Sequence, residues 1–345
     1  MTITGLGLVA DDLTGALDAA APFATPARPV RLPWRIPVTA GTRIAVSTES
    51  RHLPADRAAA AVAAAVARLR PVLPGAGTLW FKKVDSVLRG QPLAETVAMA
   101  RACGLSTCIF APAFPAMGRI TRDGRHLVRS ADGRWEATRH GDLSGAFAAL
   151  SRDLLPEIVV VNAETQADLR QSTEAWRHRH DILWAGSRGL AEAIAGGCKP
   201  LAAPGVGLFV IGTDHPVTRQ QVRALQGIAV DAGDGPIIPR PGAPLLLDPV
   251  QAAATPAQTR TRLAQALREA RPPPDGAAVL VTGGDTLTIV LDATGATALD
   301  CIGEIAPGLP VSRIAGGRWD AATLISKSGG FGSGTTLRDL VAAPG

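Results

Sequence analysis

Short apolar runs of strand length alternate with longer alanine- and leucine-rich stretches along almost the whole chain. This alternation is typical of parallel sheets covered by helices. In the first half it predicts strands at residues 6–10, 43–48, 78–84, 107–111, 157–161 and 181–184, with helices at 56–69, 92–102 and 165–179. In the second half it predicts strands at 206–212, 245–248, 278–282 and 324–327, with helices at 216–226, 256–270 and 286–294.

A segment rich in glycine and proline, residues 196–205, interrupts this alternation and predicts a linker. A chain of 345 residues is too long for one ordinary core and fits two. We therefore predict an α/β fold with two domains, residues 1–200 and 205–345, each built on a mostly parallel sheet covered by helices.

The net charge of +5 raises the question of nucleic acid, but the basic residues are scattered along the chain. Because tyrosine is absent and Phe and Trp are few, an aromatic platform for bases is hard to build, so we expect no nucleic-acid partner. A positive field suits an anionic small substrate equally well. No apolar run is long enough to cross a bilayer and no signal-peptide pattern is found, so we expect a cytoplasmic protein with no membrane partner.

Lysine is rare in this chain. The 35 basic residues include only four lysines, Lys82, Lys83, Lys199 and Lys327. A lysine kept where arginine is the default cation indicates a need for a compact point charge, which suits phosphate and carboxylate ligands. The four cysteines show no metal-ligand spacing and are expected to be reduced.

Two adjacent carboxylates, Asp11 and Asp12, follow the first predicted strand and precede Thr14 and Gly15. In an open parallel sheet, ligands bind at the carboxyl ends of the strands, so this pair can bind sugar hydroxyls, hold Mg²⁺ or accept a hydroxyl proton. The structural alternative is that Asp12 or Thr14 caps the following helix. One aspartate is enough for a cap, so the pair favours a function.

The predicted strand at 78–84 also runs into a polar turn. Lys82, Lys83 and Arg89 can clamp a carboxylate there, while Asp85 and Ser86 can bind hydroxyls. The segment 47–52 follows another strand in the same way. The proline-fixed segment 111–121 is either a substrate wall or a stiff connection, and Gly124 and Gly133 just after it predict hairpin turns.

The second half carries three turns suited to phosphate. Glycines follow predicted strands at residues 212 and 283–284, each just before a helix, and the segment 326–334 combines Lys327 with several glycines. Glycine lets the backbone approach phosphate oxygens, and a helix N-terminus supplies N–H groups and positive dipole. None of the three is a Walker loop, because the spaced Gly-Lys-Ser/Thr is missing.

These blocks, in this order, resemble the four-carbon acid sugar kinases over nearly the whole chain. The matching segments are 10–15 with Asp18, 50–51, 82–90, 112–119, 186–191, 282–286, 303–310 and 327–332. The resemblance implies an acid-sugar-binding domain at residues 1–200, a nucleotide-binding domain at 205–345 and an active site in the cleft between them. It further implies ATP-dependent phosphorylation of a hydroxyl, usually the terminal one, of threonate, erythronate or an oxo-tetronate.

The resemblance also implies two sets of contacts. Those to the substrate fall on Asp11 or Asp12, Arg51, Lys82, Lys83, Val84 and Asp85. Those to the nucleotide fall on Thr213, Gly283, Gly284, Asp285, Thr286, Gly329, Gly330, Phe331 and Gly332, and we add Lys327 as a residue that approaches the phosphates. The chain departs from the family pattern at Thr213, His215, Asp285, Asn162 and Leu17.

From these observations we predict phosphoryl transfer from ATP with Mg²⁺ as cofactor and no assigned protein ligand for the metal. One aspartate of the pair orients or deprotonates the hydroxyl. We favour Asp12 for this role and expect its partner to cap the helix, because successive side chains of a strand point to opposite faces. The expected partners are the acid sugar and ATP, and a homodimer is one assembly compatible with them.

Two rival hypotheses come from other classes. A non-catalytic acid-sugar sensor on the same fold is suggested by the departures at Thr213, His215 and Asn162, and ATP turnover with a panel of acid sugars separates it from a kinase. A nicotinamide-dependent dehydrogenase requires a Gly-x-Gly-x-x-Gly turn that opens a helix and an acidic residue further on, and the glycine runs do not supply that context.

Overall fold

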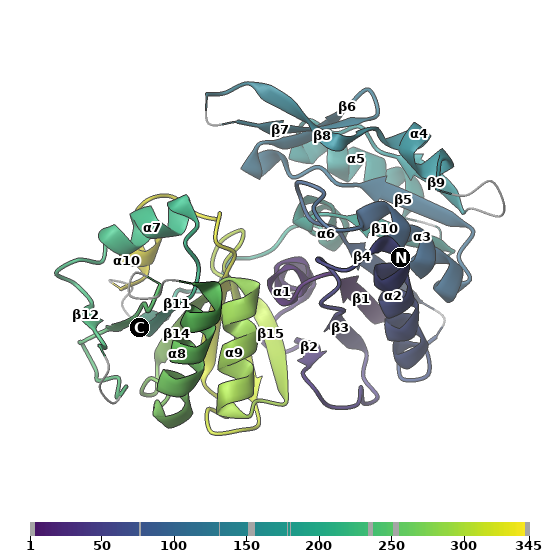
Figure 1. Ribbon diagram of the computed structural model, residues 1–345. Helices are drawn as coiled ribbons and strands as arrows, with labels where there is room; N and C mark the ends of the chain where they lie inside the picture. Colours follow the sequence, from purple (N-terminus) through teal and green to yellow (C-terminus); the bar gives the residue numbers. More distant parts are fainter. Residues whose placement is uncertain are drawn as a thin grey trace. The chain divides into compact units, whose positions relative to one another are not determined.

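The computed structural model describes residues 4–75, 77–130, 132–150, 156–177, 179, 181–233, 237–250 and 255–341 (Figure 1). The chain divides into two compact units. The first comprises Met1–Phe23 and Pro37–Cys198, and the second comprises Ala24–Ile36 and Lys199–Gly345. The division after Cys198 falls in the predicted linker, but the assignment of Ala24–Ile36 to the second unit differs from the sequence prediction.

The sheet of the first unit has the strand order β3-β1-β4-β10-β5-β9. Each neighbouring pair in this order is parallel. The strands are β1 (Gly5–Ala10), β3 (Arg43–Ser47), β4 (Thr78–Lys83), β5 (Thr107–Ala111), β9 (Glu157–Val160) and β10 (Ile182–Gly186). Each was predicted to within two residues, because buried parallel strands read as continuous apolar runs.

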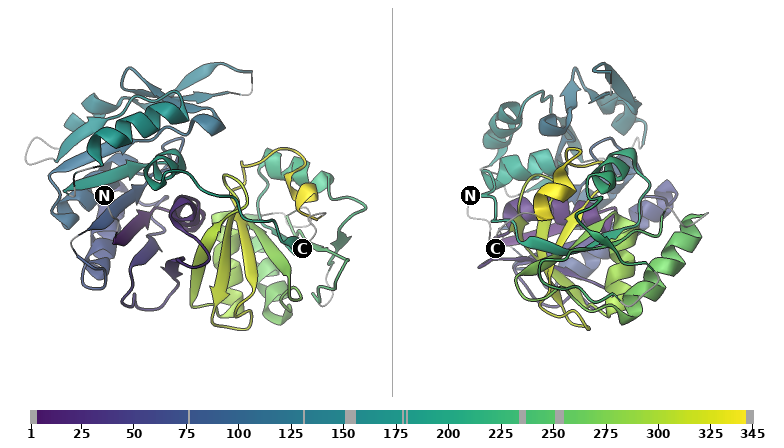
Figure 2. Two further views of the ribbon diagram at one scale, coloured as in Figure 1. Left: turned by 180° about the vertical axis from the view of Figure 1, so that it is seen from behind. Right: turned by 90° about the vertical axis from the view of Figure 1, so that its left-hand side faces the viewer.

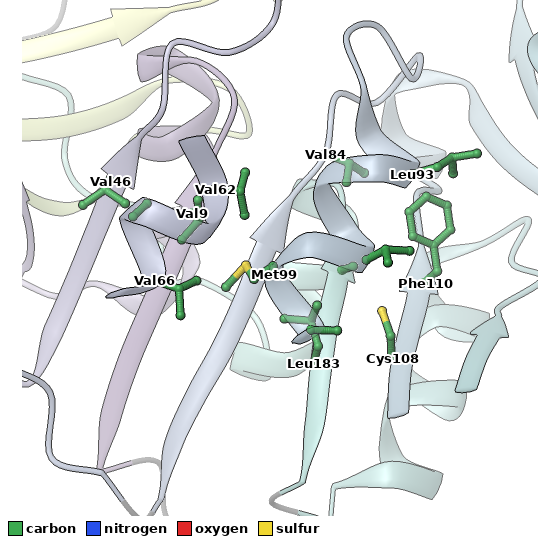
Figure 3. Close-up of a cluster of buried hydrophobic side chains, with 14 of the residues drawn as sticks. Val9, Val46, Val62, Val66, Val84, Leu93, Met99, Cys108, Phe110 and Leu183 are labelled. Carbon is green, nitrogen blue, oxygen red and sulfur yellow. The ribbon is translucent and has the colours of Figure 1, made fainter. Parts of the chain in front are cut away.

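Helices cover both faces of this sheet, as right-handed crossovers between its parallel strands require. The helices are α1 (Leu13–Ala20), α2 (Ala55–Leu69), α3 (Pro92–Cys103), α4 (Leu143–Ala148), α5 (Gln166–Trp176) and α6 (Arg188–Ala195). Helices α2, α3 and α4 bury their apolar faces on one side, where Val62, Met99 and Phe147 join Val9 and Leu183 of the sheet in one core cluster. Figure 3 shows this cluster beneath α2 and α3.

A separate three-stranded antiparallel sheet completes the first unit. Its strands are β6 (Arg119–Arg122), β7 (Arg125–Arg129) and β8 (Trp135–Asp142). Asp123 and Gly124 both have positive φ, 50° and 71°, as a two-residue type I′ hairpin requires. Gly133, with φ 83°, lies in the turn that leads to β8. Both predicted hairpin turns are therefore confirmed.

The sheet of the second unit has the order β12-β13-β11-β14-β17-β16-β15-β2. The strands β12 (Val230–Asp231), β13 (Leu245–Leu247), β11 (Gly205–Ile211), β14 (Ala277–Thr282) and β17 (Thr323–Lys327) are parallel. The strands β16 (Pro310–Ala315), β15 (Ala298–Glu304) and β2 (Val30–Pro33) are antiparallel to their neighbours. Figure 2 (left) shows the strands of this unit from behind.

Strand β2 explains why an early segment belongs to the second unit. It pairs with β15 in antiparallel register, Asp300 opposite Arg31, and the Arg31 guanidinium donates to both Asp300 carboxylate oxygens at 3.0 Å. Trp34 and Arg35, just after the strand, donate to the carboxylate of Asp292. Such pairing joins residues far apart in the sequence, and no local pattern predicts it.

The helices of the second unit are α7 (Pro216–Arg223), α8 (Pro256–Glu269), α9 (Gly284–Thr294) and α10 (Thr336–Val341). Helix α8 starts with a capping box between Thr255 and Gln258. Helices α7 and α10 pack together, as do α8 and α9, and a core containing Phe209, Leu280 and Ile325 lies against the sheet. In the part of the chain that the structure describes, no helix has the length and apolar character needed to cross a bilayer.

Candidate functional site

The polar loops of the first unit all follow the carboxyl ends of its parallel strands, which form one side of the sheet, here called its edge. Because the strands are parallel and in register, Ala10 lies opposite Ser47, and Lys83 lies opposite Gly186. The residues that follow these strand ends therefore share that edge. They include Asp11 and Asp12, the segment 48–51 and the loop 84–90. The structure thus brings the predicted substrate residues of three separate segments together.

Arg51 is the centre of this cluster. Its guanidinium donates two hydrogen bonds to Asp11, at 2.8 and 3.0 Å, and two to Asp12, both at 2.9 Å. It also lies 3.6 Å from the Asp85 carboxylate. The three carboxylates hold the pKa of Arg51 above its ordinary value although burial opposes this. Arg51 was predicted to hold the substrate, and the structure shows it holding the carboxylates that would meet the substrate.

Asp11 is buried, with 3% of its surface exposed. Burial alone would raise its pKa, but Arg51 and the two neighbouring lysines outweigh burial and hold the pKa of Asp11 below its ordinary value. Gly90 lies close by, since a Cβ built on it would be 3.3 Å from the Asp11 Oδ2. Asp11 is therefore an ionised carboxylate at neutral pH.

Asp12 is the N-cap of α1. Its Oδ1 accepts the Gly15 N–H at 2.9 Å and its Oδ2 accepts the Thr14 hydroxyl at 2.9 Å. We had assigned the cap to the other aspartate, and this was wrong because the chain already turns at Asp12. Each Asp12 oxygen carries a capping bond besides its bond from Arg51. The described contacts of each Asp11 oxygen include only one side-chain bond, so Asp11 keeps more acceptor capacity for a ligand.

Asp85 begins the loop after β4. Its Oδ1 accepts the backbone N–H groups of Val87 and Arg89 at 3.0 and 3.2 Å, and its Oδ2 accepts from the Arg89 guanidinium at 2.6 Å. These bonds and the charges of Arg89 and Arg51 outweigh burial and hold the pKa of Asp85 well below its usual range. Asp85 is thus held ionised and in one orientation.

The two lysines of β4 have different roles because they point to opposite faces of the strand. Lys82 is fully buried, and its ammonium lies 2.8 Å from the carboxylate of Glu95 on α3 and donates to the Lys83 carbonyl. Ser50 donates to the other oxygen of Glu95 at 2.6 Å. Lys82 was predicted to contact the substrate, but in the structure its buried charge is paired with Glu95 inside the unit.

We expect Glu95→Ala to lower the free energy of unfolding by about 3–5 kcal/mol, because the variant leaves the Lys82 ammonium buried without its partner charge. Urea denaturation followed by circular dichroism measures this change. Glu136 on β8 is exposed, and Glu136→Ala serves as a control with an expected effect within about 0.5 kcal/mol. Equal stability of the Glu95 variant and the unchanged protein would show that the pair contributes nothing.

Lys83 is the last residue of β4, and its side chain points to the face opposite that of Lys82. Its ammonium donates to the Val84 carbonyl at 2.9 Å and lies beside the first turn of α1, 3.5 Å from the position of a Cβ built on Gly15. Among the described residues, no carboxylate lies within ion-pair distance of it. Lys83 is therefore the cation of the cluster that can still take a substrate carboxylate. Val84, also predicted, is buried and contributes its backbone carbonyl.

In the second unit, the three turns predicted to bind phosphate also lie together, at the carboxyl ends of neighbouring parallel strands. Ile211 lies opposite Thr282, and Thr282 lies opposite Lys327 in the parallel ladders of β11, β14 and β17. The turns at Gly212, Gly283 and Ser328 therefore leave the sheet at the same level. Contact between two of them is close, because a Cβ built on Gly329 would lie 3.2 Å from the Thr213 hydroxyl.

The turn at Gly283 opens helix α9. Gly283 has φ 91°, which strongly favours glycine, and no side chain caps the helix. The first N–H groups of α9 are thus available for an anion. Thr286 sits on this turn, and its hydroxyl would be 2.1 Å from a Cβ built on Gly212, so only glycine fits there. Asp285 points outward, with 86% of its side chain exposed.

Lys327 holds the glycine loop that follows it. Its ammonium donates to the carbonyls of Ser328, Gly329 and Phe331 at 3.0, 3.4 and 3.1 Å, and to the Thr218 hydroxyl at 3.2 Å. Burial lowers the pKa of Lys327 to about 8, so the side chain is still mostly charged at neutral pH. The structure shows that Lys327 organises the loop 328–331, and its predicted contact with phosphate stays a prediction.

Two residues of α7 that the sequence analysis missed support the same loop. The Thr218 hydroxyl donates to the Gly329 carbonyl at 2.7 Å, and the Gln221 amide donates to the carbonyls of Phe331 and Ser333. Residues three apart on a helix lie on the same face. The polar pair on the helix after the glycine turn could therefore have indicated a face that contacts a neighbouring loop. The ring of Phe331 also packs on Gly308, where a Cβ would lie 2.1 Å from the ring.

Two family models match separate parts of this chain. The sugar-binding N-terminal domain matches residues 6–141 and the nucleotide-binding C-terminal domain matches residues 247–337. The first match contains the cluster around Arg51, and the second contains Gly283 and Lys327.

Proteins named as D-threonate kinases match this chain over almost its full length. The chain is 31% identical to a D-threonate kinase from Cupriavidus necator and 29% identical to one from Bordetella bronchiseptica, each match covering 96% of this chain and 95% of the relative. A D-erythronate kinase from Heliobacterium modesticaldum is 29% identical over 64% of this chain and 60% of that protein. A crystal structure from Salmonella typhimurium LT2 shares the fold, with a TM-score of 0.72, 20% identity and coverage of 97% and 98%.

Proposed function

For this chain, which belongs to the four-carbon acid sugar kinase family, we propose that the reaction is transfer of the γ-phosphoryl group of ATP to a hydroxyl, the terminal one, of a four-carbon acid such as D-threonate or D-erythronate. The observation that carries the proposal is the cluster at the sheet edge of the first unit. There, no carboxylate of the described residues lies within ion-pair distance of Lys83, and the charge of Lys83 helps to lower the pKa of Asp11 and of Asp85.

The chemistry of an acid sugar fits this cluster. Its carboxylate requires a cation, which Lys83 supplies, and its hydroxyls require acceptors, which Asp11 and Asp85 supply. Phosphoryl transfer depends mainly on alignment and on neutralising charge. Asp11 would orient the attacking hydroxyl and take its proton as the bond to phosphorus forms. Arg51 would keep Asp11 ionised and fixed.

The second unit supports the nucleotide side of the proposal. The uncapped N-terminus of α9 offers N–H donors to the phosphates, and the loop 328–331 offers backbone held by Lys327. Within the described ranges no group of three or more His, Cys, Asp or Glu side chains is placed to hold a metal ion. Magnesium would therefore enter with the nucleotide phosphates, and we assign it no protein ligand. The interdomain cleft expected from the sequence is part of this proposal, since hydroxyl and γ-phosphate must meet.

A thermal-shift screen of four-carbon acids, with and without Mg-ATP, tests binding, and ADP release in the same mixtures tests turnover. We expect stabilisation by D-threonate or D-erythronate, and ADP release that requires the acid. Stabilisation by the acid without any ADP release would instead support the sensor hypothesis, which the departures at Thr213 and His215 motivated.

We expect Lys83→Ala to raise the KM for the acid sugar by about 10–100-fold while the KM for ATP stays within about twofold, because the variant removes the charge proposed to bind the substrate carboxylate. Steady-state kinetics with each substrate varied in turn measures both constants. Lys199, an exposed lysine outside both clusters, provides the matched control Lys199→Ala, which should leave both constants unchanged. A selective rise in the KM for ATP would place Lys83 on the nucleotide.

A further inference from the structure

Side chains of the small sheet β6-β7-β8 lie against the backbone carbonyls of every second residue of the loop 84–90. His126 Nε2 lies 2.8 Å from the Ser86 carbonyl oxygen. His140 Nε2 lies 3.3 Å from the carbonyl oxygen of Leu88, but it also accepts the Arg139 Nε–H at 3.3 Å. The Arg139 guanidinium donates to the carbonyl of Gly90. These side chains come from β7 and β8, which contribute no residue to the ligand cluster described above.

His126 is fully buried and its proton position follows from its neighbours. The Ser86 carbonyl only accepts, so Nε2 carries the hydrogen and donates it. Nδ1 then accepts from the Thr121 hydroxyl at 3.2 Å. Burial lowers the pKa of His126, which keeps the imidazole neutral at physiological pH. The ring is thus held at both nitrogens.

The Ser86 carbonyl, which accepts from His126, belongs to the same peptide unit as the Val87 N–H group, which donates to Asp85. In a trans peptide the C=O of one residue and the N–H of the next point in opposite directions. The Ser86 carbonyl therefore meets His126 while the Val87 N–H meets the Asp85 Oδ1. The Arg89 N–H donates to the same Oδ1.

The loop needs such support because its conformation is not relaxed. Leu88 has φ 60°, a left-handed conformation that costs a non-glycine residue free energy. The small sheet is itself fixed to the rest of the unit, since Thr121 and Ala163 exchange backbone hydrogen bonds at 2.9 and 2.8 Å and the Asn162 side chain accepts the Gly124 N–H. It can therefore act as a rigid support.

We propose that His126 is a positioning residue for the Asp85 carboxylate, acting through the peptide unit 86–87. It orients the Val87 N–H group, and this N–H helps to fix the carboxylate that meets the substrate. This inference rests on the proposed function for the part that concerns substrate, and on the loop geometry alone for the part that concerns Asp85.

The test compares His126→Leu with His126→Gln in the full-length protein. We expect the Leu variant to raise the KM for D-threonate or D-erythronate by about 10–100-fold and leave the KM for ATP within about twofold, because misplaced substrate contacts weaken binding at that site only. The Gln variant should stay within about threefold, because its amide N–H can still donate to Ser86. Arg125→Ala, an exposed change beside His126, is the matched control.

Hydrogen exchange of the Val87 amide gives a readout that does not depend on activity. We expect Val87 to exchange faster in His126→Leu than in His126→Gln, while amides of β4 keep their protection. Unchanged exchange at Val87, or equal losses of melting temperature in both His126 variants with no change in KM, would overturn the proposal. If the unchanged protein phosphorylates no four-carbon acid but Val87 exchange responds as expected, the positioning role stands and the proposed function fails.

Discussion

Asp11→Asn is expected to lower kcat by about 10²–10⁴-fold, as loss of a general base does. Asp11 is the carboxylate of the pair that makes no capping bond, and Arg51 holds it ionised. The amide keeps the size of the side chain but cannot take a proton from the substrate hydroxyl. Steady-state kinetics with a saturating acid sugar measures this loss, and the KM for ATP should change little.

Asp12→Asn is the matched variant. Asparagine caps helices as well as aspartate does, so the capping bond to Gly15 survives. The charged pair with Arg51 is lost, so the expected loss of stability is about 1–3 kcal/mol. Its kcat should fall far less than that of the Asp11 variant. Near-normal activity of Asp11→Asn would remove Asp11 from the mechanism, and a large loss in Asp12→Asn alone would return the role to the residue that the sequence favoured.

Lys327→Met is expected to raise the KM for ATP by about 10–1000-fold, because hydrogen bonds from a charged donor to three loop carbonyls are lost at once. Methionine fills similar space but has no charge to hold the carbonyls of Ser328, Gly329 and Phe331. The KM for the acid sugar should stay within about threefold, because the hydrogen bonds that the structure describes for Lys327 all go to residues of the second unit. Kinetics with each substrate varied in turn measures both.

Two further measurements distinguish the effect of the Lys327 charge on ATP binding from the effect of its side-chain packing. Thr218→Val removes one hydroxyl from the same loop and should have a smaller effect of the same kind. The pKa of Lys327 is about 8, so the KM for ATP of the unchanged protein should rise as pH increases through that value, and the Met variant should lack this rise. An ATP affinity that is normal in Lys327→Met would show that the loop keeps its shape without the ammonium.

Strand positions followed from the sequence because buried parallel strands are continuous apolar runs ended by polar or glycine residues. The antiparallel strands β15 and β16 were missed for the opposite reason. Strand β15 carries Asp300, whose partner is Arg31 of β2, and a bulge lies between Cys301 and Gly303. Its polar residue and irregular register hide the strand pattern from any local window.

The sequence predicted which residues lie in the site, but it did not predict which partners those residues bind. Charged residues at the ends of parallel strands share an edge, so the sequence could place Asp11, Arg51 and Lys83 together. It could not show that Lys82 pairs with Glu95, because the two residues meet only when α3 packs on β4. The same holds for Lys327, whose partners are carbonyls of its own loop and a hydroxyl from α7.

The most direct measurement is product analysis by ³¹P NMR after incubation of the protein with Mg-ATP and D-threonate or D-erythronate, each alone. The account predicts a new phosphate monoester signal in proportion to ADP with at least one of the acids, and its loss in Asp11→Asn. Formation of ADP without a phosphorylated acid, or no reaction with any four-carbon acid while the protein binds one, would contradict the assignment of this chain as an acid sugar kinase.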